Sequence, residues 1–205
     1  MSEHLRQFVA AAAKATAPGA RVLDVDAGGA PYGELFEHAA YETADWDGSE
    51  ALPVEERAFD VVLSTQALEH APEPQRAVGE LHRVLVEGGS LYLSVSLVRE
   101  LQEPPPGDYY RYTPSSLEFL LAGAGFEDVS VTPLNDCFAT LAQLLLNART
   151  TMGRSADGLD DRREEAAAVL EGLAEQLAPL GPLDVHWELP LGFAATARRP
   201  AGSTA

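Results

Sequence analysis

The sequence predicts an α/β fold with an open, doubly wound and mostly parallel sheet, and three observations support this prediction. Between residues 21 and 97, apolar β-branched runs alternate with helical patterns, as in successive βαβ units. A turn of small residues, 26–30, follows the first apolar run. The 205 residues are enough for one such domain with a substantial core.

The first half of the chain supplies four of the expected strands. Residues 1–18 are expected to form a helix docked on the surface, because apolar residues recur at helical spacing (Leu5, Phe8, Val9 and Ala12). Apolar strand patterns follow at 21–26, 41–45, 59–65 and 90–97, with a short helix at 32–38. A second helix is predicted at 74–86, with Pro74 in its first turn and Gly88-Gly89 at its left-handed exit.

The second half begins with a Pro-rich loop, QEPPPGDYYRYTP, which carries three tyrosines around Arg111. Thr113 and Pro114 suit the N-cap and first position of a helix, and a strand is expected at 126–132. Residues 133–190 are expected to be mostly helical. A closing strand is predicted at 192–199.

Composition narrows the classes of function. The net charge of −18 argues against nucleic acid as a partner, because nucleic-acid binders usually carry a basic face, and favours a small-molecule substrate. No apolar run approaches the roughly 18 residues of a membrane span, and the alanine-rich start is too weak for a signal peptide. With Cys137 as the single cysteine, we expect a cytoplasmic protein that does not bind membranes, as a monomer or homodimer.

The segment RVLDVDAGGAPYGELF, residues 21–36, indicates a nucleotide-binding turn. In an open α/β sheet, ligands bind at the carboxyl ends of the strands, where a glycine allows the backbone to approach closely. Asp45 lies 21 residues after Asp24 and ends the second predicted strand, where a carboxylate can accept hydrogen bonds from both ribose hydroxyls. An adenosine-containing cofactor is therefore predicted. The dinucleotide pattern G-x-G-x-x-G and the Gly-Lys-Ser/Thr of a P-loop are both missing from the turn.

Five segments in this order resemble class I S-adenosylmethionine (SAM)-dependent methyltransferases, specifically the methyltransferase-11-like branch. They are VLDVDAGGAPYGELF, YETADW, FDVVLSTQALEHAPEP, LHRVLVEGGSLYLSV and DYYRYTPSSLEFLLAGAGF, and they cover about residues 20–132. The resemblance implies a single Rossmann-like domain over 1–205 with seven strands, the last antiparallel. In this arrangement residues 134–190 would be a helical lid inserted before the final strand.

The resemblance also implies a set of cofactor contacts. The turn would lie under the methionine portion and ribose of SAM, Asp45 would take the ribose hydroxyls, and other residues would flank adenine or the reactive sulfur. The implied cofactor-binding residues are Asp24, Asp26, Ala27, Gly28, Tyr32, Asp45, Trp46, Leu52, Ser64, Thr65 and Gln66. Asp26 and Ala30 occupy positions where the family normally has glycine. We expect the altered turn still to bind SAM.

The mechanism implied is in-line transfer of the SAM methyl group to an oxygen or nitrogen of a small molecule. A base is needed only if the acceptor is a hydroxyl or a protonated amine.

His70 is the candidate base; the alternative is a histidine packed against the cofactor loop for structure. Tyr109, Tyr110 and Arg111 are candidates for holding an aromatic or carboxylated substrate; the alternative is that the tyrosines pack the loop and Arg111 pairs with Asp108. His186 is a further candidate substrate contact, and no metal site is predicted.

Two classes of function remain beside a small-molecule methyltransferase of secondary metabolism. One is a SAM-fold protein that does not methylate, either a cofactor-assisted cyclase or a partner-binding pseudoenzyme, which the altered glycine positions favour. The other is a nicotinamide-dependent oxidoreductase, which the missing dinucleotide pattern disfavours.

Overall fold

A computed structural model describes residues 3–25, 30–46, 48, 50–99, 107–154, 160–184 and 189–202. The chain forms two compact units. Unit 1 comprises Met1–Ser96, Leu101–Thr132 and Phe193–Ala205, and unit 2 comprises Leu97–Glu100 and Pro133–Gly192. Unit 1 carries the sheet, so it is the unit in which a ligand site of the predicted kind must be sought.

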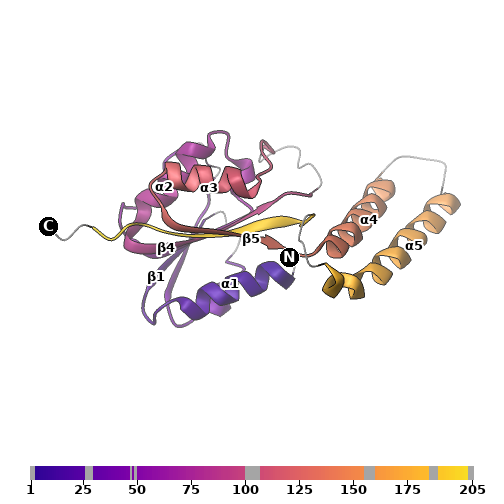
Figure 1. The fold of residues 1–205 in the computed structure, drawn as a ribbon, viewed down its shortest axis with the longest axis horizontal. Helices are drawn as coiled ribbons and strands as arrows, with labels where there is room; N and C mark the ends of the chain where they lie inside the picture. Colours follow the sequence, from indigo (N-terminus) through magenta and orange to yellow (C-terminus); the bar gives the residue numbers. More distant parts are fainter. Residues whose placement is uncertain are drawn as a thin grey trace. The chain divides into compact units, whose positions relative to one another are not determined.

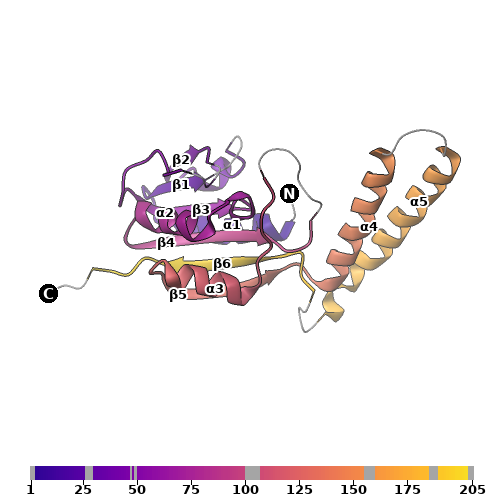
Figure 2. The same ribbon diagram turned by 90° about the horizontal axis from the view of Figure 1, so that it is seen from above.

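Six strands form the sheet, in the order β2-β1-β3-β4-β6-β5. Their bounds are β1 Arg21–Val25, β2 Ala40–Ala44, β3 Phe59–Thr65, β4 Leu85–Ser96, β5 Glu127–Leu134 and β6 Gly192–Arg198. The pairings β1–β2, β1–β3 and β3–β4 are parallel. Strand β6 runs antiparallel to β4, because the amide of Gly88 donates to Arg199 O and the amide of Arg199 donates back to Gly89 O (Figure 2). The doubly wound sheet and its antiparallel last strand are confirmed.

The expected count of seven strands is not met: the described part of the chain has six. The difference arises at residues 45–58, which link β2 to β3. A crossover between parallel strands takes about a dozen residues or more, and this link must pass β1 to reach β3. No strand is described between β2 and β3, so β2 is the edge of the sheet.

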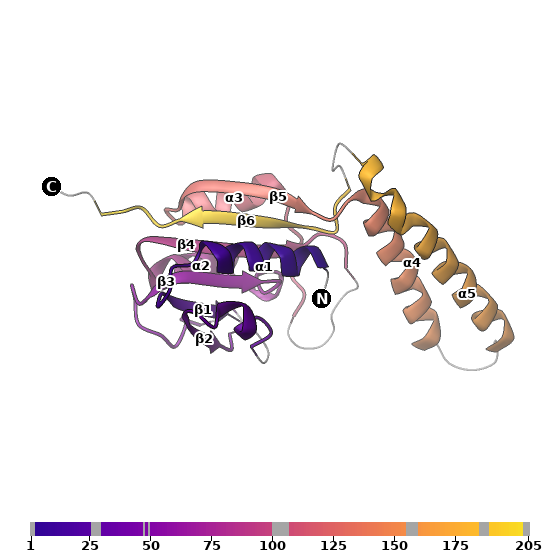
Figure 3. The ribbon, with the colours of Figure 1, turned by 90° about the horizontal axis from the view of Figure 1, so that it is seen from below.

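Helices cover both faces of the sheet (Figures 1 and 3). Helix α1, Glu3–Ala15, lies on one face and buries its apolar stripe, including Leu5 and Val9, in a cluster with Val22 and Leu63. Helices α2, Pro74–Val84, and α3, Pro114–Gly123, lie on the other face. Single turns of 3-10 helix occur at η1, Gly33–Phe36, where a short α-helix was expected, and at η2, Leu68–His70.

The sequence predicted that Gly88 and Gly89 end a helix, but the structure shows otherwise. Helix α2 stops at Val84, and both glycines lie inside β4, where the register with β3 shifts. Gly88 has φ of 76°, and a Cβ on Gly89 would lie 3.1 Å from Asp60 O. A left-handed glycine serves a helix exit and a strand irregularity equally well, so the local pattern could not separate the two.

Unit 2 is built from helices α4, Cys137–Arg154, and α5, Asp160–Leu177, followed by the 3-10 helix η3, Ala178–Leu183. The backbone amide of Cys137, at the start of α4, donates to the Asp184 carboxylate at 2.7 Å, which ties the start of α4 to the residue after η3. Helices therefore occupy much of 133–190, and the role of this region as a lid stays a prediction. None of the described helices is long and apolar enough to cross a membrane.

Ala30 closes the turn after β1 in a left-handed conformation, with φ of 58°, and its carbonyl accepts a hydrogen bond from Gly33 N at 3.2 Å. Left-handed backbone costs an L-residue about 1–2 kcal/mol. This is one of the two positions where related sequences normally carry glycine. The backbone thus keeps a conformation suited to glycine although the residue is alanine.

We predict that Ala30→Gly raises the free energy of unfolding by about 1 kcal/mol, because it removes the left-handed penalty. For a chain of this size that corresponds to a rise in melting temperature of about 2–4 °C. Ala124→Gly is the matched control, since Ala124 has φ of −84° and gains nothing from glycine. Thermal and urea unfolding of both variants test the prediction. A loss of stability in Ala30→Gly equal to that in the control contradicts it.

Candidate functional site

The carboxyl end of β1 is the point where the winding of the sheet reverses. The chain leaves β1 for β2 on one side and returns to β3 on the other. Val25 pairs with Ala44 of β2 and with Ser64 of β3, so these three strands end level with one another. Ligands of open α/β sheets bind at such a point. The predicted contacts Asp26, Ala27 and Gly28 follow β1 here and lie outside the described residues.

Buried polar side chains lie at the carboxyl end of β1 and in the segment that begins at residue 30. Asp24 is fully buried and accepts a hydrogen bond from the Tyr41 hydroxyl of β2. Tyr32 is also buried and is hydrogen-bonded to the side chain of Thr65 at the end of β3. Burial raises the pKa of both phenols, and the neighbouring Asp24 carboxylate raises them further, so both tyrosines stay protonated. Asp24 therefore links β1 to β2 within the core, and Tyr32 links the segment after residues 26–29 to β3.

Asp45 follows β2 directly and is exposed at the same edge of the sheet. Trp46 is half-buried, and its indole N–H donates to Glu50 O at 2.8 Å. Asp45 thus lies one residue beyond Ala44, which pairs with Val25 at the end of β1, and Trp46 follows it in the chain.

Leu52 lies elsewhere. Its amide donates to Glu80 Oε2 at 2.9 Å, and its buried side chain lines a cavity of about 390 Å³. Arg21 and Phe59, the first residues of β1 and β3, line the same cavity. This cavity therefore involves the amino ends of the strands, and Leu52 is not brought together with Asp45.

The end of β3 turns toward β4. Ser64 is buried within the strand, whereas Thr65 and Gln66 are partly exposed. Gln66 has φ of 57°; its amide donates to Ser94 O at 2.8 Å and its side-chain amide donates to Ser96 Oγ at 3.0 Å. Thr65 and Gln66 are therefore held at the switch point, with the Gln66 side chain directed at the end of β4.

His70 is held against the loop that precedes α3. It is buried, and its Nδ1 lies 2.6 Å from Gly107 O. Because a carbonyl only accepts, Nδ1 must carry the hydrogen, and in the neutral ring Nε2 is then the acceptor. The contact supports a structural role for His70 and also leaves a ring nitrogen of the kind that a base requires.

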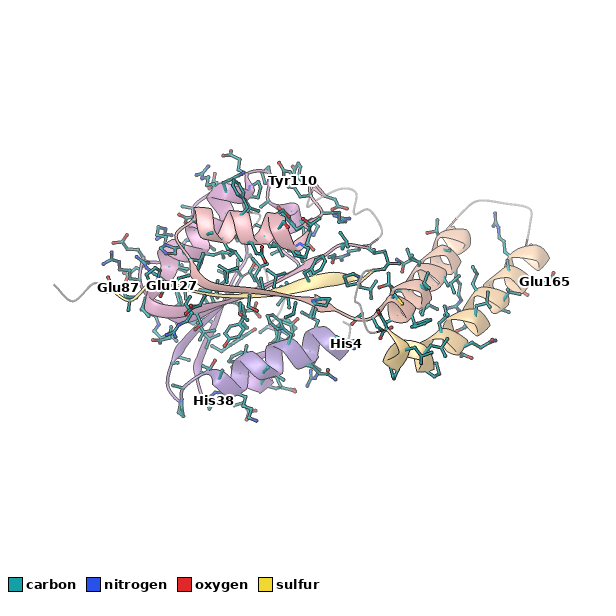
Figure 4. All side chains as sticks on the ribbon, viewed as in Figure 1. His4, His38, Glu87, Tyr110, Glu127 and Glu165 are labelled. Atoms are coloured by element: carbon teal, nitrogen blue, oxygen red, sulfur yellow. The ribbon has the colours of Figure 1, made fainter. Side chains whose placement is uncertain are left out.

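Tyr109 and Tyr110 are exposed, at 55% and 40%, and Tyr110 projects at the surface of unit 1 (Figure 4). Their ring centroids lie 6.4 Å apart. Arg111 forms an ion pair with Asp108, with Nη2 2.7 Å from Oδ2. The structure thus shows the alternative expected for Arg111, its pairing with Asp108, and this ion pair neutralises the guanidinium charge. His186 lies outside the described residues.

Glu69 is a site residue that the sequence analysis missed. It is 2% exposed, and its carboxylate accepts a hydrogen bond from the backbone amide of Ser96. Its backbone carbonyl accepts the amides of Tyr109 at 3.0 Å and Tyr110 at 3.3 Å. Desolvation by burial raises the pKa of this carboxyl. The feature of the sequence that could have identified Glu69 is its position, since it is an acid in a short turn after an apolar strand, flanked by Leu68 and His70.

Across the described ranges, no three His, Cys, Asp or Glu side chains gather in a way that could hold a metal ion.

Residues 8–93 match the family model of a methyltransferase domain. This span contains most of α1, the first three strands, residues 26–30, Asp45, Glu69 and His70. The match covers less than half of the chain and identifies a methyltransferase-like segment in residues 8–93. The resemblance seen in the sequence is confirmed, and the expected cofactor, SAM, agrees with the family match. A comparison with curated proteins finds no significant match.

Solved structures share the fold at low sequence identity. The 4+2 cyclase SpnF is 21% identical with a TM-score of 0.57, covering 97% of this chain and 81% of that one. A methyltransferase from Bacillus halodurans, described as putative, is 16% identical with a TM-score of 0.55 and is covered completely, with 98% of this chain. Haemonchus contortus phosphoethanolamine N-methyltransferase 2, in complex with SAM, is 16% identical with a TM-score of 0.57 over 95% of this chain and 52% of its own. These similarities establish the fold alone.

We predict that Glu69→Gln raises the free energy of unfolding above that of the wild type, and that this gain is larger at neutral pH than at acid pH. The folded-state pKa of Glu69 is raised, so the wild type loses stability as pH rises from the unfolded carboxyl pKa of about 4.3 through the folded value. Glutamine does not titrate, so the difference between variant and wild type should grow across that window. Urea unfolding at a series of pH values measures it.

Glu80→Gln is the matched control with the opposite sign. Hydrogen bonding to Arg83 lowers the pKa of Glu80, so its contribution is present above the unfolded pKa and lost as pH falls through the folded value. This variant should lose stability at neutral pH. A pH-independent difference between Glu69→Gln and wild type contradicts the assignment of Glu69.

Proposed function

We propose that the protein is a SAM-dependent methyltransferase whose acceptor is an uncharged aromatic small molecule. The observation that carries the proposal is the exposed Asp45 carboxylate, which directly follows β2 at the switch point of the sheet, where β1, β2 and β3 end level with one another. A carboxylate at this place suits the two hydroxyls of a ribose.

The described residues fit such a cofactor. Ala30 keeps the left-handed conformation of a glycine position, so the turn retains its backbone course at that point. Asp45 would accept the ribose hydroxyls, Trp46 would flank the adenine, and Thr65 with Gln66 would line the methionine portion. When bound, SAM supplies an electrophilic methyl group. The chain's own contribution is to align the acceptor and exclude water, which can account for much of a transfer rate.

The acceptor class follows from the tyrosines and from Arg111. Tyr109 and Tyr110 present exposed rings on a backbone held by Glu69 O, and aromatic rings offer large contact area to a planar molecule. Arg111 is paired with Asp108. An acceptor carboxylate would have to compete with that ion pair, so a neutral phenol or aromatic amine is favoured over an aromatic acid.

His70 is the proposed base for a hydroxyl acceptor. Its Nδ1–H is committed to Gly107 O, which sets the ring so that Nε2 can take a proton. An acceptor that is already a neutral amine needs no base for its attack, and His70 would then serve only to hold residue 107. The helical region 134–190 is proposed as the lid that sets substrate choice.

A SAM-fold protein without methyl transfer is the second candidate. Asp26 and Ala30 stand where glycines are usual in the family, and the structurally similar SpnF is described as a cyclase. Binding of S-adenosylhomocysteine as tight as that of SAM, together with no transfer to any acceptor, would favour this candidate.

We predict micromolar binding of SAM and S-adenosylhomocysteine by calorimetry, lost or weakened at least about tenfold in Asp45→Ala, because hydrogen bonds to a charged group contribute about 1.5–3 kcal/mol. Glu127→Ala removes an exposed acid from β5, at the far end of the strand order, and should bind as the wild type does. No binding of either ligand to the wild-type protein would refute the cofactor assignment.

Acceptor choice gives a further prediction. With a panel of uncharged phenols and aromatic amines and radiolabelled SAM, Tyr109→Ala should raise the acceptor KM by about fivefold or more, whereas Tyr109→Phe keeps the ring and stays close to wild type. Phe119→Ala is the control, because Phe119 is 74% exposed on α3 and has no assigned role. Equal KM values for Tyr109→Ala and wild type would remove Tyr109 from the acceptor site.

A further inference from the structure

Glu69 joins three parts of the candidate site through one residue. Its carboxylate accepts the amide of Ser96, the last residue of β4. Its backbone carbonyl accepts the amides of Tyr109 and Tyr110. The residue itself lies in η2, directly before His70. The end of β4, the exit of β3 and the tyrosine segment are therefore linked at a single point.

We propose that Glu69 is a positioning residue that holds Tyr109 and Tyr110 at the acceptor site by anchoring their backbone to the end of β4. The inference rests on the proposed function, because it assigns the tyrosine segment to acceptor binding. The anchor works in two steps: the carboxylate fixes the residue to the sheet, and the carbonyl of the fixed residue then receives both tyrosine amides.

The burial of Glu69 supports a specific role over simple packing. Its Oε2 is buried, and within the part of the chain that the structure describes it has no hydrogen-bond partner. An unsatisfied buried oxygen destabilises a fold, and an apolar residue of similar size would avoid that cost. The charged and titratable groups that interact electrostatically with it are His70, Arg111 and Tyr112. A residue with this cost is expected where its hydrogen bond fixes geometry.

The neighbouring contacts show why the anchor controls the tyrosines. Tyr112 donates its hydroxyl to Leu68 O at 3.2 Å, and Tyr110 donates to Pro72 O at 3.3 Å. His70 donates to Gly107 O. All three bonds join residues 107–112 to residues 68–72, and none of them reaches the sheet. The Glu69 carboxylate supplies the bond that connects this pair of segments to β4.

Hydrogen exchange followed by mass spectrometry on the full chain tests the proposal. Glu69→Asp shortens the side chain and pulls the carboxylate back from Ser96, whereas Glu69→Gln keeps an acceptor oxygen at the same reach. We expect Glu69→Asp to lower protection of peptides spanning 107–112 by about fivefold or more, and Glu69→Gln to stay within about twofold of wild type. Glu80→Asp, a partly buried acid on α2, should leave these peptides unchanged.

Two outcomes overturn the proposal. One is unchanged protection of residues 107–112 in Glu69→Asp. The other is an equal fall in the protection of peptides from β1 and β3, which would indicate general loosening.

A second measurement uses an acceptor found with the phenol panel. Glu69→Asp should raise the KM for this acceptor by more than it lowers kcat, and Glu69→Gln should keep the wild-type KM. Binding of S-adenosylhomocysteine, measured in the same variants, should not change. If the wild-type protein does not bind S-adenosylhomocysteine, the proposed function is refuted. The exchange result tests the role of Glu69 alone.

Discussion

The need to keep the Asp24 carboxylate hydrogen-bonded inside the core governs the carboxyl edge of the sheet. A buried carboxylate without partners would destabilise the fold by several kcal/mol, so Tyr41 from β2 must lie against it. That contact joins β1 to β2 just below the turn. Tyr32, bonded to Thr65, joins the segment after the turn to β3. Side chains on both sides of residues 26–29 are thus bonded to neighbouring strands.

A second constraint follows from how the chain leaves β3. Gln66 adopts a left-handed conformation and bonds to Ser94 and Ser96, which turns the chain toward β4. The 3-10 turn that follows brings Glu69 to the same serine. Two side chains from this exit therefore converge on the end of β4. This convergence places the tyrosine segment beside the switch point, although the tyrosines lie some 40 residues later in the chain.

Glu69 and Glu80 show how similar residues acquire opposite electrostatic roles. Glu80 accepts hydrogen bonds from the Arg83 guanidinium, and its pKa falls. Glu69 is desolvated by burial, and its pKa rises although hydrogen bonds from Ser96 oppose the rise. The sequence does not distinguish the two acids. Arg111 differs, because the sequence already offered its pairing with Asp108 as an alternative, and the folded loop forms that ion pair.

The sequence by itself determined the fold class and the order of the strands along the chain, because both depend on local patterns of apolar and small residues. From the same kind of pattern it predicted the place of the cofactor turn. It also pointed to Asp45, since a strand end followed by an acid is a local feature. Tertiary structure decided the number of strands, the use of Gly88-Gly89 inside β4, and the partners of Asp24, Glu69 and His70. These depend on which residues distant in the chain meet across the sheet. Burial and hydrogen bonding are properties of that meeting, so no local pattern encodes them.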